Sequence, residues 1–192
     1  KGFWRMDTHV IDFHLHPIHY EYYGESTLNW LKSIHAGKNW DEFYASYCDP
    51  NFFVQYLKAS GVDYGVVLAE LSPAVTGICS NEYVLEFCRG QEMLIPFASI
   101  NPFTTVRMDI ELQRLVEKGY RGIKMYPTYQ HFYPNDPSLY PLYARAEELQ
   151  IPVMFHTGSS VFEGARLKYG DPLYLDDVAV DFPKMKIILV HG

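Results

Sequence analysis

The sequence lacks several features that would assign it to a specialised class of protein. Its 192 residues include only three cysteines, Cys48, Cys79 and Cys88, which form no Cys-x-x-Cys pair. An odd number of widely spaced cysteines favours free thiols in a reducing compartment over a disulfide framework. No apolar run reaches the length of a membrane-spanning helix, and the first residues show no signal peptide. We therefore expect a cytoplasmic protein without a membrane partner.

A surplus of basic residues is also missing. The sequence has 16 Lys and Arg against 23 Asp and Glu, which gives a net charge of −7. Proteins that bind nucleic acid usually carry a basic surplus, so this balance argues against a nucleic-acid partner. Hydrophobic residues make up 48% of the sequence and charged residues 20%, which is typical of a folded globular domain.

What the sequence does contain is an alternation of short apolar runs with amphipathic stretches. The expected strands are residues 9–16, 62–70, 94–101, 122–126, 153–156 and 187–191. The expected helices, which begin at capping or proline signals, are residues 51–60, 82–89, 108–118, 138–149 and a segment from 171 to before 183. Strands and helices in repeated alternation predict a parallel sheet with crossover helices.

The first turn after a strand distinguishes between two parallel architectures. A dinucleotide-binding open sheet would place glycines there, whereas this sequence has His14-Leu15-His16-Pro17. We therefore predict an α/β protein with the (β/α)₈ TIM-barrel fold. Because such barrels have eight strands and about 250 residues, residues 1–192 are expected to form one barrel domain truncated after about six strands. Residues 18–47 are expected to be an insertion that covers the site, contacts a second subunit of a homodimer, or packs on the barrel.

Polar residues alternate along the first expected strand. Asp12, His14 and His16 share one face of an ideal strand, because side chains two residues apart point the same way. The residues between them are apolar: Ile11, Phe13 and Leu15. We expect the apolar set to face the outer helices and the polar set to face the barrel interior, where two imidazoles reach one divalent cation. For this motif alone, hydrogen-bonded histidines on a partly exposed strand are the alternative.

Two later strands also end in histidine. His156 ends the strand at 153–156, and His191 ends the strand at 187–191. The carboxyl ends of barrel strands meet at one mouth, where the active sites of this fold lie. A hydrogen-bonded core histidine explains each residue separately but explains their convergence poorly. The pattern therefore indicates one shared site.

Taken together, these elements resemble the amidohydrolase superfamily, in particular the branch grouped with aminocarboxymuconate-semialdehyde decarboxylase. The similarity lies in the Asp-x-His-x-His strand, Gly-Ile-Lys-Met at 122–125, Phe-His-Thr-Gly at 155–158 and Val-His-Gly at 190–192. The resemblance implies that His14, His16 and His156 bind one divalent metal ion, commonly zinc. It also implies that His191 is the acid/base residue beside a metal-bound water. A further metal-ligating Asp would end an eighth strand, which these residues do not contain.

The resemblance implies a metal-dependent hydrolase or a non-oxidative decarboxylase that acts on a small carboxylate, amide or lactone. Lys124, Asn101 and Arg166 are expected to contact the substrate, with ordinary structural roles as the alternative, and Asp12 is expected to support a ligand. For Lys124, a carbamylated form that bridges two metals is a further alternative. Because Asp-x-His-x-His also opens PHP-type and TatD-like phosphoesterases, such an enzyme is an alternative, as is a non-catalytic ligand-binding barrel.

Overall fold

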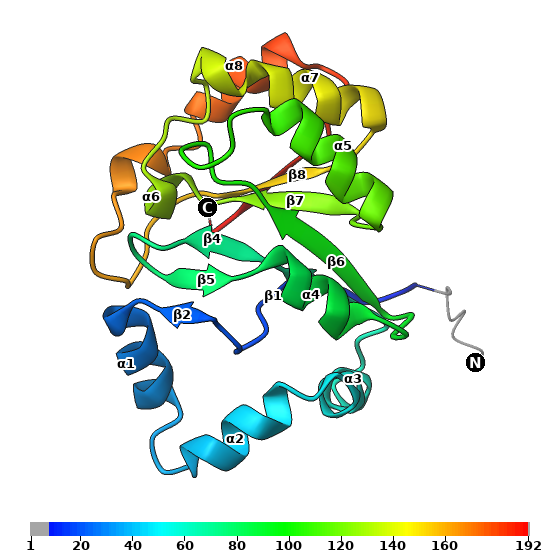
Figure 1. Ribbon diagram of the computed structural model, residues 1–192, viewed down its shortest axis with the longest axis vertical. Coiled ribbons are helices and arrows are strands. Elements are labelled where there is room, and N and C mark those ends of the chain that lie inside the picture. Colours follow the sequence, from blue (N-terminus) through cyan, green and yellow to red (C-terminus); the bar gives the residue numbers. More distant parts are fainter. Residues whose placement is uncertain (1–7, 192) are drawn as a thin grey trace, which may run out of the picture.

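The largest element of the computed structural model, which describes residues 8–191, is a curved six-stranded parallel sheet (Figure 1). Its strands follow one another in chain order: β1 (Ile11–Leu15), β3 (Tyr64–Leu68), β6 (Leu94–Ser99), β7 (Gly122–Met125), β8 (Val153–His156) and β9 (Ile187–Val190). Neighbours in this order pair in parallel throughout. This is the strand order of a TIM barrel, so the prediction of a barrel represented by about six strands is confirmed.

Helices cover the outer face of this sheet. They are α3 (Pro50–Ala59), α4 (Asn81–Cys88), α5 (Met108–Lys118), α7 (Tyr140–Leu149) and α8 (Tyr174–Asp181). Shorter turns of helix are α6 (Pro127–Gln130), η1 (Pro137–Leu139) and η2 (Leu167–Tyr169). Leu112 and Leu142 bury their side chains against Ile123 and Phe155 in the outer core. Each such burial stabilises the fold by about 1.5 to 3 kcal/mol.

The inner face of the sheet has its own, smaller apolar cluster. Val66, Leu68, Phe97 and Met154 are almost completely buried there. Outward-facing and inward-facing residues alternate along β7 and β8, as expected for a strand that is buried on both faces. The inner cluster fills the barrel beneath the carboxyl ends of the strands.

The alternation fails in β1. Asp12 pairs with Gly65 and Leu15 pairs with Val67, so three steps along β1 oppose two along β3. Such a β-bulge turns the side chains that follow it to a different face. The ring of Phe13 consequently contacts Phe97 of the inner cluster, at a centroid distance of 6.4 Å. The expectation that Phe13 faces the outer helices is therefore wrong.

A second, three-stranded antiparallel sheet lies beside the ends of the barrel strands. It contains β2 (Tyr22–Tyr23), β5 (Gly77–Cys79) and β4 (Glu70–Ser72), in that order. The sequence indicated one strand from 62 to 70, but β3 ends at Leu68 and β4 begins at Glu70. Gly77 has a φ of +127° and lies directly against the Tyr22 carbonyl group, so a side chain has no room at this position.

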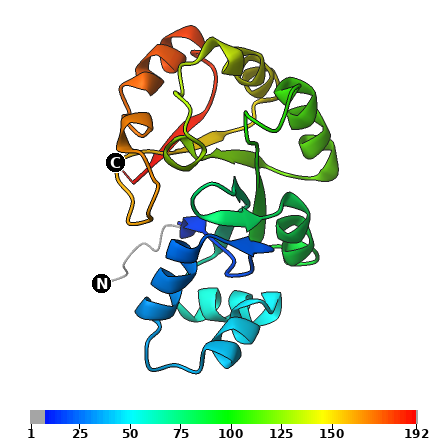
Figure 2. The same ribbon diagram turned by 60° about the vertical axis from the view of Figure 1, so that its left-hand side comes forward.

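The segment expected as an insertion forms helices. α1 (Glu25–Ile34) and α2 (Trp40–Tyr47) follow β2 and lead into α3. Figure 2 shows α1 below the loop that follows β8, far away from it in the sequence. The segment therefore lies at the same side of the molecule as the loops that follow the barrel strands.

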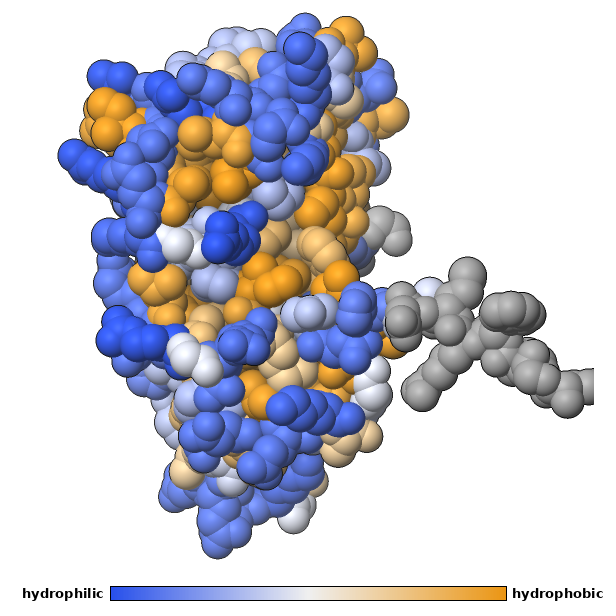
Figure 3. All heavy atoms as spheres, turned by 90° about the vertical axis from the view of Figure 1, so that its right-hand side faces the viewer, coloured by the Kyte–Doolittle hydropathy of each residue, from blue (hydrophilic) through white to orange (hydrophobic). Residues whose placement is uncertain are grey.

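Apolar side chains reach the surface at both edges of the main sheet. Ile11 and Phe13 of β1 are 45% and 42% exposed, and Leu189 of β9 is 47% exposed. Figure 3 shows one face of the molecule, on which apolar groups lie between polar ones. Within residues 8–191, no helix combines the length and the apolar character needed to cross a membrane.

Candidate active site

The four histidines selected from the sequence lie together at the carboxyl ends of β1, β8 and β9. The Nε2 atoms of His14 and His16 face each other at 3.1 Å. The ring of His191 lies between two others, with centroid distances of 4.5 Å to His14 and 4.6 Å to His156. The structure thus brings together side chains that are up to 177 positions apart, counted from His14 to His191.

His191 has an unusual backbone conformation. Its φ of 67° lies in the left-handed region, where side chains other than glycine are uncommon and histidine is among the more tolerated. The chain leaves β9 at this residue. Its ring nevertheless contacts two of the other histidines, and the residue is the most exposed of the four. The ring of His191 therefore belongs to the histidine cluster, at the edge of the sheet.

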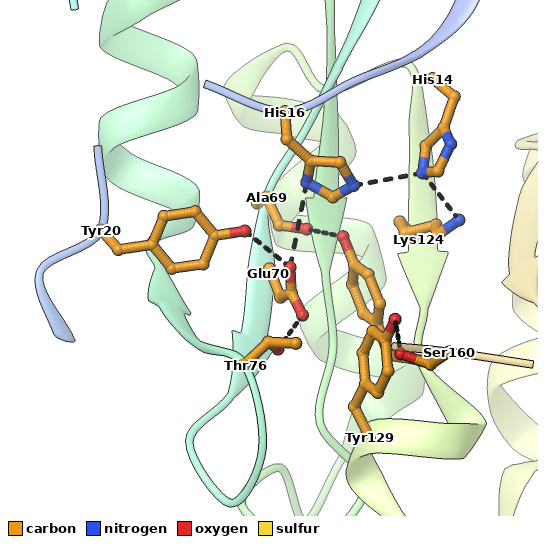
Figure 4. A network of polar contacts seen from close by, with 10 residues as sticks. His14, His16, Tyr20, Ala69, Glu70, Thr76, Lys124, Tyr129 and Ser160 are labelled. Atoms are coloured by element: carbon orange, nitrogen blue, oxygen red, sulfur yellow. Dashed lines mark hydrogen bonds and ion pairs between the residues drawn. The ribbon is translucent and has the colours of Figure 1, made fainter. Parts of the chain in front are cut away.

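A buried carboxylate lies behind His16. Glu70, the first residue of β4, is 3% exposed, and its Oε2 atom lies 3.9 Å from His16 Nδ1. Tyr20 donates a hydrogen bond of 2.7 Å to Oε2, and Thr76 donates one to Oε1. Figure 4 shows His16 between this carboxylate and His14. Burial raises the pKa of Glu70, while the bonds from Thr76 and Tyr20 oppose that rise.

Lys124 lies beneath the histidines. It lies on β7 between Ile123 and Met125, which face the outer core, so the Lys124 side chain points to the inner face of the sheet. This side chain is completely buried. Its Nζ atom lies 3.5 Å from His14 Nε2 (Figure 4) and 5.4 Å from the ring centroid of Tyr126. Burial lowers the pKa of Lys124 to about 7, although the nearby Glu70 opposes this.

Burial keeps the imidazoles neutral. It lowers the pKa of both His16 and His156 to about 3, with Lys124 adding a further repulsion. The pKa of His14 is lowered still further, by burial and then by His16, and the pKa of His191 is also lowered by burial. At neutral pH these rings therefore offer nitrogen lone pairs rather than positive charges.

One cavity of about 410 Å³ connects these groups, and all four histidines line it together with Glu70. This volume is in the range of small-molecule sites. The remaining wall is largely apolar and includes Trp30 from α1, Tyr129 from α6 and Phe162 from the loop after β8. A small molecule in the cavity would lie directly against the imidazoles.

Three other residues selected from the sequence lie outside this cavity wall. Asn101 is buried, but its side chain donates to the Leu71 carbonyl group and accepts from the Phe103 amide. Arg166 is exposed beside η2. Asp12 accepts a hydrogen bond of 3.1 Å from the His14 amide, so it contacts a site residue through the backbone. Asn101 and Arg166 thus have no contact with the histidines in this structure.

The donor set fits a divalent cation in its chemistry. Among residues 8–191, no three His, Cys, Asp or Glu side chains are close enough together to hold a metal ion. Two observations nevertheless fit a metal ion at these nitrogens. The His156 Nε2 atom is buried without a hydrogen-bond partner, and two further Nε2 atoms face each other on β1 and the residue after it. Neutral imidazole nitrogen is a common ligand of zinc and of other divalent ions.

Comparison with known proteins identifies the family. Residues 11–192 match the amidohydrolase family, so the chain belongs to it. The prediction from the sequence is confirmed in this respect.

Several solved structures have a similar fold. An uncharacterized TIM-barrel protein from Bordetella bronchiseptica has 23% sequence identity and a TM-score of 0.73, over 94% of this chain and 66% of that protein. A probable 2-pyrone-4,6-dicarboxylic acid hydrolase from Acinetobacter baumannii, with citric acid bound, has 17% identity and a TM-score of 0.56, over 95% and 58%. A variant of 5-carboxyvanillate decarboxylase from Novosphingobium aromaticivorans, with bound manganese and a nitrobenzoic acid derivative, has 14% identity and a TM-score of 0.60, over 94% and 64%. This chain thus spans two thirds or less of the length of each of these proteins.

Proposed function

We propose that this chain forms most of a metal-dependent hydrolase or non-oxidative decarboxylase that acts on a small molecule. One observation carries the proposal: four histidines from the ends of three separated strands line a single cavity. The names of two structural neighbours, a hydrolase and a decarboxylase, support both reaction types. The manganese in the decarboxylase supports a requirement for a divalent ion.

In this proposal, His14, His16 and His156 hold one divalent ion, for which we expect zinc. When bound, the ion would supply Lewis-acid activation of water or of a substrate carbonyl group. Glu70 holds His16 from behind, through the approach of its carboxylate to Nδ1. His191 accepts and returns the proton at its imidazole, since the lowered pKa keeps the ring unprotonated at neutral pH.

The charges around the cavity argue against a phosphoesterase. Among the described residues, no Arg or Lys side chain lines the cavity. Enzymes that cleave phosphate esters usually hold the phosphate with such cations or with several metal ions, and among the described residues Glu70 is the one carboxylate of the lining that could bind a further ion. The other alternative, a non-catalytic ligand-binding barrel, would show no turnover and would not require the metal ion.

Metal analysis of the purified protein tests the proposal. We expect about one divalent ion per chain by elemental mass spectrometry, and loss of that ion in the double variant His14→Ala/His156→Ala. His9→Ala is the matched control, because His9 is exposed and lies near Asp63, outside the cavity wall. Unchanged metal content in the double variant, or equal loss in the control, would contradict the proposed site.

A further inference from the structure

Two segments that are far apart in the sequence meet at the outer side of the cavity. The rings of Trp30 in α1 and Phe162 in the loop after β8 are in edge-to-face contact, at a centroid distance of 5.4 Å. On the same two segments, the Glu163 amide donates a hydrogen bond of 3.0 Å to Ser26 Oγ. Both ring side chains line the cavity. The outer wall is therefore held together by an aromatic contact and a hydrogen bond.

A series of aromatic rings connects this outer wall to the histidines. Phe162 contacts Tyr129 at 6.0 Å between ring centroids, and Tyr129 contacts His156 at 4.5 Å. The Tyr129 hydroxyl group is paired with Ser160 Oγ at 2.9 Å. Because this hydroxyl already has a partner, the wall presents mainly ring surface to a ligand. Trp30, Phe162 and Tyr129 are hereafter called the aromatic wall.

No charged group of the described chain accompanies the aromatic wall. The cavity lining includes one carboxylate, Glu70, whose oxygens accept hydrogen bonds from Tyr20 and Thr76. Lys124 lies beneath the histidines and is not part of the lining. An anionic group placed against Trp30 and Phe162, the two outer rings of the wall, would lose water without gaining a cation from the described residues, which is unfavourable. An uncharged ring would gain from the same burial.

We infer that the aromatic wall binds a flat, uncharged apolar group of the substrate, such as an aromatic ring, in preference to an anionic one. The inference deepens the proposed function, since the reactive bond is placed at the histidines on the strength of that proposal. It favours a neutral aryl ester, lactone or amide over a substrate that carries a carboxylate on this side. The cavity volume of about 410 Å³ admits such a ring together with its reactive group.

A matched pair of probes tests the inference. A naphthol N,N-dimethylsulfonamide and the matching naphthol sulfonate have the same ring and differ mainly in charge, and the dimethylated nitrogen has no N–H proton to lose and so does not bind a metal ion as a sulfonamide anion. We expect isothermal titration calorimetry to show at least about tenfold tighter binding of the sulfonamide, a difference of about 1.4 kcal/mol. Equal or tighter binding of the sulfonate would overturn the inference.

Substitution of the wall provides a second measurement. Trp30→Ala is expected to weaken sulfonamide binding about tenfold, because it removes one ring of the wall. Trp40→Ala is the matched control, since Trp40 packs on Phe43 and Tyr44 and does not line the cavity. Equal losses in both variants, or no loss in Trp30→Ala, would contradict the assignment of the wall.

Metal content measured on the same samples separates the two proposals. Probe binding requires neither an ion nor turnover. Preference for the sulfonamide in a protein without a metal ion would support the wall and contradict the proposed enzyme. Preference for the sulfonate in a protein that holds one ion per chain would overturn the wall and leave the metal site supported.

Discussion

The two sides of the cavity are built by different kinds of structure. The inner side consists of imidazoles at the ends of parallel barrel strands, held by pairing of each strand with its neighbours. The outer side comes from α1 and the loop after β8, which meet through one ring contact and one hydrogen bond. In our proposals, the reactive groups thus lie at the ends of the sheet strands and the ligand-selecting surface on connecting segments, as in many enzymes with this fold.

Glu70 connects the two sides. It belongs to the small antiparallel sheet, yet its carboxylate approaches His16 at the edge of the barrel. The bonds from Tyr20 and Thr76 hold the carboxylate in place. We therefore expect variants of the histidines at the strand ends to change turnover or metal binding, and variants of the aromatic wall to change ligand preference. Variants of Glu70, which lies outside the barrel sheet, should change metal binding at the histidines.

The largest effect is expected from His191→Ala. Removal of the acid/base group should lower turnover of a neutral aryl ester or lactone by about 10² to 10⁴. Metal content and binding of the naphthol sulfonamide should stay within about twofold of the unmodified protein, because neither property uses this imidazole in our proposal. Steady-state kinetics measure the first effect. Retained turnover would remove His191 from the acid/base role, and loss of the metal would make it a ligand.

A smaller effect is expected from Glu70→Gln, which keeps the side-chain volume and removes the negative charge behind His16. Loss of such a supporting carboxylate typically lowers metal affinity by about 10-fold to 100-fold. Competition with a chelator measures the change. Glu21→Gln is the control, because Glu21 is exposed and contacts Ser80. Metal affinity that stays within twofold in Glu70→Gln would show that the small antiparallel sheet does not support the inner side.

The comparison also shows where sequence patterns predict the site and where they do not. His14, His16, His156 and His191 could be selected because each lies at or near the end of an apolar run, and parallel strands bring such ends together. The bulge in β1 could not be predicted, since it depends on pairing with β3.

The sequence predicts the outer side of the cavity less well. Trp30 and Phe162 lie in segments without a strand period, and their contact depends on how two long connections fold over the barrel. Glu70 ends the expected strand at 62–70, where capping of a following helix would equally explain a carboxylate. Gly77, the first residue of β5, lies against the Tyr22 carbonyl group of β2 and gives a local hint of the small sheet. Asn101 and Arg166 were selected by position alone, which says nothing about side-chain direction.

The smallest effect concerns the cost of burying Lys124 beneath the histidines. Burial lowers its pKa from 10.5 to about 7, so between these pH values the unfolded chain binds more protons than the folded one. The free energy of unfolding of the unmodified protein therefore rises with pH across this window. The stability of Lys124→Met relative to the unmodified protein should therefore be greater at pH 7 than at pH 10.5, by at least about 1 kcal/mol.

Urea denaturation at several pH values measures this difference between Lys124→Met and the unmodified protein. Lys118→Met is the control, because Lys118 is exposed at the end of α5 and pairs with Glu82 at the surface. It should change stability little and without a trend across the window. If the advantage of Lys124→Met is the same at every pH, the lysine does not titrate near pH 7. Reduced stability of Lys124→Met throughout would show instead that its amino group holds His14 in place, so that the inner side of the cavity depends on this contact.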